Sequence, residues 1–294
     1  MRPRDVALAL LVVLLWGVNF VVIKAGLAGI SPFVLGALRM LFTAVPAVFL
    51  LPRPRVPFRL YAGFAAFTFL GQFTLLFWAI KVGMPSGLAA VVQQSQVLFT
   101  LVFALVVFGE VPRRSHLIGI AVAACGLGWL AGSRGTAFPL PGFVLTACAA
   151  ASWGAGNLVS RALSRYSVNA LAFVVWSALL ATLPFLGLAW LFEGADAVRQ
   201  SFQALTVRSW AAVLYLALGA TVGGYGLWNR LLKAYPTALV TRFALLVPVI
   251  ALVCGNLVFG ERIAPAQAAA SALVVMGVAL PLAAAFWARF FFEG

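Results

Sequence analysis

Side-chain amides stand inside segments that are otherwise apolar, and they are the groups best suited to bind a polar solute. Gln93, Gln96 and Thr100 recur at i, i+3 and i+7 of one apolar run, so they would share one face of a helix. An amide offers two N–H donors and a carbonyl acceptor, which suits a zwitterion such as an amino acid. The alternative is structural, because amides also hold membrane helices together by hydrogen bonds. The spacing favours the lining of a solute-binding cavity.

Other polar and aromatic residues within apolar runs extend this candidate site. Arg242 could hold a carboxylate by two parallel hydrogen bonds, or reach instead toward a membrane surface. Tyr225 and Trp228 fall at i and i+3 on one helix face. For Arg39 we favour a structural role. Pro248 leaves a carbonyl without its helical partner and is the predicted hinge. The predicted substrate-binding residues are Asn19, Gln72, Gln93, Gln96, Asn157, Tyr225, Trp228 and Arg242.

Catalytic chemistry has little support in this sequence. The single histidine, His116, lies beside two arginines at the start of an apolar run, and Cys125, Cys148 and Cys254 lie inside such runs. Neither a set of metal ligands nor a nucleophile with its base can be assembled from these residues. We therefore expect no enzyme activity, no cofactor and no metal.

The elements that must position the polar residues are long apolar helices. Of the 294 residues, 64% are hydrophobic and 9% charged, whereas about a quarter of a soluble domain is charged. A transmembrane helix needs about 20 apolar residues, and transmembrane strands would be about half as long with alternating polarity. The apolar runs are 6–26, 32–51, 60–80, 85–108, 115–131, 141–161, 168–192, 209–231, 236–259 and 266–288. This pattern predicts an all-α membrane protein with ten transmembrane helices.

The basic residues predict the orientation of these helices. The net charge is +14, and the loops on the side that holds both termini receive twice as many Lys and Arg residues as the other loops. Because cytoplasmic loops collect Lys and Arg, we place both termini in the cytoplasm. No basic run exceeds two residues, so the charge indicates membrane loops and not a nucleic-acid partner. The longest predicted loop, residues 193–208, lies on the side with fewer basic residues.

The chain contains an internal repeat. Pro85-Ser-Gly-Leu-Ala corresponds to Pro236-Thr-Ala-Leu-Val, and the Phe-Gly-Glu that ends at Glu110 corresponds to the one that ends at Glu261, both at an offset of 151 residues. Trp16-Gly-Val-Asn19 has its counterpart in Trp153-Gly-Ala-Gly-Asn157. The halves are 1–132 and 137–294, with five helices each. Because five is odd, the second half enters the membrane from the opposite side, an arrangement typical of secondary transporters.

These motifs resemble the drug/metabolite transporter superfamily and, within it, the EamA-type exporters of bacteria. The similarity rests on the Trp-Gly-x-Asn start, the Phe-Gly-Glu at the end of the fourth helix of each half, and Ala79-Ile80-Lys81 followed by Pro85-Ser86-Gly87-Leu88-Ala89. It covers the whole chain. The resemblance implies export of amino acids, including aromatic ones, or of other metabolites. Arg39 matches a common family position that has no counterpart in the second half.

We therefore expect an exporter of the bacterial inner membrane that works by alternating access around a central cavity. The cavity should lie between the halves and be lined from helices 1, 3, 4, 6, 8 and 9. All six acidic residues lie at predicted helix ends, in loops or at a terminus, so transport should not depend on a mid-membrane carboxylate. A polar-solute channel and an exporter of another metabolite or drug are the alternatives. The expected partners are a small-molecule substrate, an amino acid, and the lipid bilayer. We expect a monomer, with an oligomer left open.

Overall fold

The computed structural model describes residues 1–133 and 138–292, and every regular element within them is helical. The first half contains α1 (Pro3–Gly26), α2 (Pro32–Val48), α3 (Phe58–Phe64), the π-helix η1 (Ala65–Gly71), α4 (Gln72–Lys81), α5 (Ser86–Gln93), α6 (Gln96–Phe108) and α7 (Arg114–Gly132). The second half contains α8 (Leu140–Leu163), α9 (Ala170–Gln203), α10 (Val207–Leu214), the π-helix η2 (Tyr215–Gly223), α11 (Gly224–Ala234), α12 (Thr237–Thr241), the 3-10 helix η3 (Arg242–Leu246), α13 (Val247–Phe259) and α14 (Pro265–Phe292).

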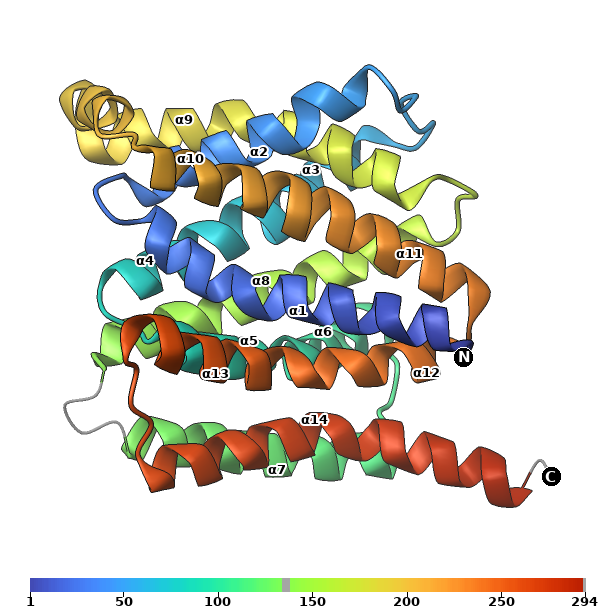
Figure 1. The fold of residues 1–294 in the computed structure, drawn as a ribbon. Coiled ribbons are helices and arrows are strands. Elements are labelled where there is room, and N and C mark those ends of the chain that lie inside the picture. Colours follow the sequence, from blue (N-terminus) through green and yellow to red (C-terminus); the bar gives the residue numbers. More distant parts are fainter. Residues whose placement is uncertain (134–137, 293–294) are drawn as a thin grey trace.

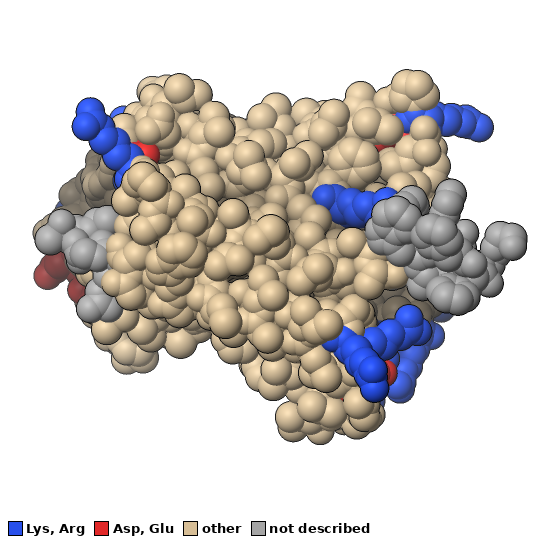
Figure 2. All heavy atoms as spheres, turned by 90° about the horizontal axis from the view of Figure 1, so that it is seen from below, with Lys and Arg blue, Asp and Glu red and all other residues tan. Residues whose placement is uncertain are grey.

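These elements form ten apolar helical segments, which confirms the predicted all-α membrane fold. Within the described residues, nine segments are long and apolar enough to cross a bilayer, and α2 is a shorter apolar helix. Several spans combine elements, as α5 and α6 do in Ser86–Phe108. On the face seen in Figure 2, charged side chains gather toward the two ends and a broad uncharged band separates them. Such a band suits contact with lipid, because charged groups are costly inside a bilayer.

The helices lie side by side in one bundle, with the connections at its two ends (Figure 1). The N terminus lies at one end with the turns between α2 and α3 and between α11 and α12, and we call this the N-terminal end. The turns before α5 and after α13 lie at the opposite end, the far end. α2 packs along α9, α4 along α8 and α1 along α13, while α7 and α14 form a pair at one edge. The fully buried aromatic side chains are Tyr61, Phe69, Phe77, Phe173 and Phe185.

The two halves are five-helix repeats of inverted topology, and their irregular points correspond. The third span of each half contains a π-helix, η1 or η2. The fourth span of each half is interrupted, by the turn at residues 94–95 in one and by η3 in the other. Both fourth spans end at a glycine with positive φ, 66° at Gly109 and 63° at Gly260, where a residue with a Cβ would be strained. These two glycines belong to the Phe-Gly-Glu motifs of the sequence repeat.

The π-helices join the two halves to each other. A π-helix leaves a backbone carbonyl without its usual helical partner, and a side chain from a neighbouring helix can supply the donor. Trp16 Nε1 in α1 donates to the Ala220 carbonyl in η2 (3.0 Å). Ser152 Oγ in α8 donates to the Phe67 carbonyl in η1 (2.8 Å). The first helix of each half is therefore bound to the third span of the other half.

The prediction of a loop over residues 193–208 is wrong for most of its length. α9 continues to Gln203, and one non-helical residue, Gly194 (φ 83°, ψ 163°), separates its two helical parts. Glycine adopts this conformation without strain. The extension is held at the far end, where the amide N–H of Ser31 donates to Ser201 Oγ (3.1 Å) just before α2. This contact between distant parts of the chain stabilises helix where local composition indicated a loop.

Candidate functional site

Three of the predicted binding amides lie buried near the middle of their spans. Asn19, Gln72 and Gln93 are all buried, and Gln93 is only 1% exposed. Within residues 1–133 and 138–292, Asn19 Oδ1 and both polar atoms of the Gln93 amide have no hydrogen-bond partner. An unpaired buried polar group costs about 1–3 kcal/mol, so such groups commonly mark a place where water or a ligand binds.

Gln96 and Asn157 bind each other. Asn157 Nδ2 in α8 donates to Gln96 Oε1 (2.6 Å) and to Thr100 Oγ1 (3.0 Å), both in α6. The turn at residues 94–95 interrupts the helix, so the face predicted for Gln93, Gln96 and Thr100 is continuous only for the last two. In this conformation the amides of Gln96 and Asn157 have a structural role, because their hydrogen bonds hold α6 and α8 together.

An aromatic cluster connects α1 with α11. The ring of Trp16 lies 5.7 Å from that of Tyr225 and 5.0 Å from that of Trp228, measured between centroids. A Cβ added to Gly224 would lie 2.5 Å from Trp16 Nε1, so glycine is what allows the ring to approach. The predicted pair Tyr225 and Trp228 therefore does share a face. Trp16 completes it and was absent from the predicted site, although the Trp-Gly motif had pointed to this position.

Arg39, for which the sequence favours a structural role, is a buried charged residue of this region. It lies in the middle of α2 and is 3% exposed. Its Nε and Nη2 atoms donate to Thr221 Oγ1 in η2 (3.4 and 3.2 Å), and its guanidinium carbon lies 4.1 Å from the ring centroid of Phe73 in α4. An arginine within an apolar span is costly, so it commonly has a partner or a functional role.

The two interrupted helices meet at their breaks. Gln94 Nε2 donates to the Ala244 carbonyl in η3 (3.4 Å). Pro248 is the second residue of α13 and has no N–H, which leaves this carbonyl available. Arg242 begins η3 and is half-buried. Pro248 and Arg242 thus lie at a break in the helix, and the hinge and binding roles assigned to them remain predictions.

The far end of the bundle is closed around a buried carboxylate. Glu261 accepts hydrogen bonds from Lys24 Nζ (2.7 Å), from the amide N–H groups of Ser86 (2.8 Å) and Gly87 (3.0 Å), and from Ser86 Oγ (3.0 Å). Its side chain is 8% exposed. Burial raises the pKa of Glu261, but the hydrogen bonds from Lys24, Gly87 and Ser86 outweigh it and hold the pKa below its ordinary value. α13 packs along α5 here, so one carboxylate joins three spans.

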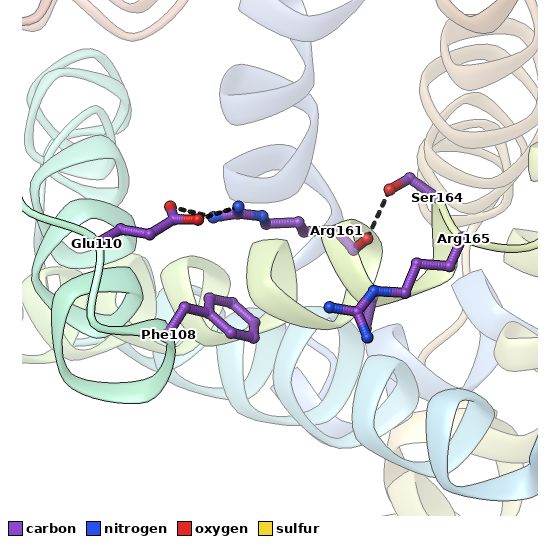
Figure 3. A pocket seen from close by; sticks show the side chains of 6 residues that line it. Phe108, Glu110, Arg161, Ser164 and Arg165 are labelled. Carbon is purple, nitrogen blue, oxygen red and sulfur yellow. Dashed lines mark hydrogen bonds and ion pairs between the residues drawn. The ribbon is translucent and has the colours of Figure 1, made fainter.

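The ion pair at the N-terminal end is more exposed than the one around Glu261. Glu110 and Arg161 point toward one another and form an ion pair (Figure 3), but their side chains are 47% and 50% exposed. They line a hollow of ≈ 400 Å³ together with Phe108 and Arg165. A second hollow of ≈ 640 Å³ opens between the N terminus and α11. In the described part of the chain, α6 and α12 show no packing comparable to that of α5 and α13.

The sequence is similar to known transporters along its whole length. It matches the EamA-like transporter family over residues 4–132 and 140–283. It is 43% identical to a Salmonella typhimurium protein named "Probable amino-acid metabolite efflux pump", with 95% of this chain and 94% of the relative covered. An Escherichia coli protein of the same name is 36% identical, with 98% of each chain covered. A solved crystal structure at 23% identity has the same fold, with a TM-score of 0.61 over 99% of this chain and 100% of that one.

Proposed function

This chain belongs to the EamA-like transporter family, and from that premise we propose that it exports amino acids or closely related metabolites by alternating access. Its family and relatives are transporters and not enzymes. Two relatives carry names that specify efflux of amino-acid metabolites. Such solutes are zwitterions or carboxylates, and the buried mid-span amides and Arg39 offer the donors and acceptors that these groups need.

One observation carries the mechanism. The far end is closed around Glu261, while the N-terminal end holds an exposed ion pair and two hollows. Alternating access requires a central site that communicates with one side at a time, and inverted repeats can exchange conformations to move the opening. A channel that conducts would be open at both ends. The closed far end therefore favours a carrier over the polar-solute channel.

We assign the N-terminal end to the cytoplasm, because that side carries the greater number of Lys and Arg residues. The cytoplasm is the side from which an exporter of the bacterial inner membrane loads its substrate, so we expect the N-terminal end to open for loading. The repeats are 1–132 and 137–294, a division that the two family matches support. Since both repeats lie in one chain, a monomer suffices for the transport cycle. A non-amino-acid metabolite or drug remains the alternative substrate class.

Counterflow in proteoliposomes tests this proposal. Vesicles are preloaded with one unlabelled amino acid at a time, and entry of the labelled amino acid is measured without a pH gradient or a membrane potential. A carrier gives transient accumulation of label that saturates with concentration. Protein-free vesicles are the control. Flux that neither saturates nor responds to preloading would indicate a channel, and counterflow restricted to solutes that are not amino acids would change the substrate class.

A further inference from the structure

Arg39 is a buried cation without a counter-ion among the described residues. The ion pairs of Lys24 with Glu261 and of Arg161 with Glu110 lie at opposite ends of the bundle, away from the middle of α2. Removing an ionised group from water costs several kcal/mol unless an opposite charge compensates for it. Its hydrogen bonds go to the Thr221 hydroxyl and its ring contact is with Phe73, and both of these groups are neutral. A negatively charged ligand would compensate for the charge of Arg39.

The guanidinium also has unused hydrogen-bonding capacity. Nε and Nη2 both donate to one hydroxyl, Thr221 Oγ1, which in turn donates to the Leu216 carbonyl (2.8 Å). Nη1 has no hydrogen-bond partner within residues 1–133 and 138–292. Phe73 covers one side of the guanidinium, and a stacked guanidinium keeps its N–H groups available in its own plane. Such an edge matches a carboxylate, which can accept two parallel hydrogen bonds.

Unpaired amide acceptors lie inside two neighbouring spans, α1 and α5. Asn19 Oδ1 is on α1 and Gln93 Oε1 is on α5, and neither has a partner in the described chain. α1, which holds Asn19, packs against η2, which holds Thr221, and against α5, which holds Gln93. Amide oxygens accept hydrogen bonds from an ammonium group. The region thus offers a cation for one end of an amino acid and acceptors for the other.

We propose that Arg39 binds the α-carboxylate of the transported amino acid, while the amide oxygens of Asn19 and Gln93 accept hydrogen bonds from its ammonium group. This inference rests on the proposed function. Arg39 is 3% exposed, so the carboxylate reaches it as the helices around it separate, and binding is thereby linked to the conformational cycle. This proposal gives Arg39 the carboxylate-binding role that the sequence analysis considers for Arg242.

Amino acids and their carboxamides separate this role from a structural one. Each amino acid carried in counterflow, beginning with phenylalanine, is compared with its carboxamide in the wild type, Arg39→Gln and Arg39→Lys. The wild type should prefer the acid. Arg39→Gln should lose about 10- to 150-fold in apparent affinity for the acid and little for the carboxamide, because only the acid loses a charge-assisted pair. Arg39→Lys should recover part of the loss, since it keeps the charge without the planar fork.

The outcomes also distinguish the two proposals. An unchanged preference for acid over carboxamide in a folded Arg39→Gln variant would overturn the role of Arg39 and leave the exporter intact. A wild type that carries no amino acid would overturn both. If Arg39→Gln does not fold, thermal unfolding of the wild type with phenylalanine or phenylalaninamide decides the question. A rise in Tm with the acid alone supports the carboxylate site, and equal shifts reject it.

Discussion

Glu261 and Glu110 each follow a Phe-Gly pair at the end of a fourth span, and each meets a cation from the first helix of a half, Lys24 or Arg161. The two cations are themselves repeat partners, at the offset of 137 residues that relates Trp16 to Trp153. Glu261 is buried and also receives the N–H groups of Ser86 and Gly87, whereas Glu110 is half exposed. Equivalent residues thus occupy two different environments in one molecule.

This difference shows what closes an end. The first backbone N–H groups of a helix have no intrahelical acceptor and carry a partial positive charge, so a carboxylate placed there is stabilised. Glu261 accepts the first N–H groups of α5, and these hydrogen bonds hold the end of α13 against the start of α5. A Cβ on Gly87 would lie 2.8 Å from Leu252 Cα, so a small residue permits this closeness. The repeat partner of Ser86 is Thr237 at the start of α12, and we expect Glu110 to engage it when the N-terminal end closes.

Cross-linking should give the largest effect. In a background where Cys125, Cys148 and Cys254 are replaced by serine, Ser86→Cys with Glu261→Cys should react rapidly with a short thiol-reactive cross-linker. The cross-linked protein should show no counterflow until the link is reduced, because the far end cannot open. Thr237→Cys with Glu110→Cys should react more slowly, as the opposite conformation is visited. Single-cysteine variants are the controls. Full transport with the far end linked would mean that this end does not open in the cycle.

Removing one carboxylate at a time should show how much Glu261 and Glu110 each contribute to closure of the far end. Glu261→Gln loses the charge that binds Lys24 and the start of α5, which should favour opening of the far end by about 2–3 kcal/mol, or roughly 30- to 140-fold. The measurement is maleimide labelling of Ala90→Cys, one turn beyond Ser86 on the same helix face. The matched control is Glu110→Gln, where little change is expected because an exposed ion pair contributes little. Equal labelling in both variants would contradict the comparison.

Acidification should give the smallest effect. Because the folded-state pKa of Glu261 is lowered, its contribution to closure is present above the ordinary carboxyl pKa and is lost as the pH falls through the lowered value. The distance between spin labels at positions 82 and 262, both at the far end, should therefore increase only when the pH falls below the ordinary pKa of a carboxyl group. Glu261→Gln should remove this dependence and Glu110→Gln should keep it. A pH response that survives in Glu261→Gln would assign the titration to another group.

The aromatic face and the helix break were within reach of sequence reasoning, for local reasons. Tyr225 and Trp228 share a face because residues at i and i+3 do so in any helix. The proline rule predicted a carbonyl without its partner, and the Ala244 carbonyl indeed accepts from Gln94. Local rules could not predict which distant residues form hydrogen bonds with a given polar side chain. The sequence predicts Asn157 as a substrate-binding residue, and only the packing of α8 against α6 reveals its hydrogen bonds to Gln96 and Thr100.

Composition and spacing alone determined that this chain is a membrane protein with ten helices, because long apolar segments of this kind cross a bilayer as helices. They also determined that the two repeats are inverted, because a repeat with an odd number of spans makes the next repeat start on the opposite side of the membrane. Tertiary structure decided which end is closed. The sequence places a glutamate, a preceding glycine and a basic partner at each end of the bundle. It is therefore equally compatible with closure of the far end and with closure of the N-terminal end. Only the burial of Glu261 against α5, and the exposure of Glu110, select one of them. The reason is physical, since burial and pairing are properties of the packed helices and not of the residues that they contain.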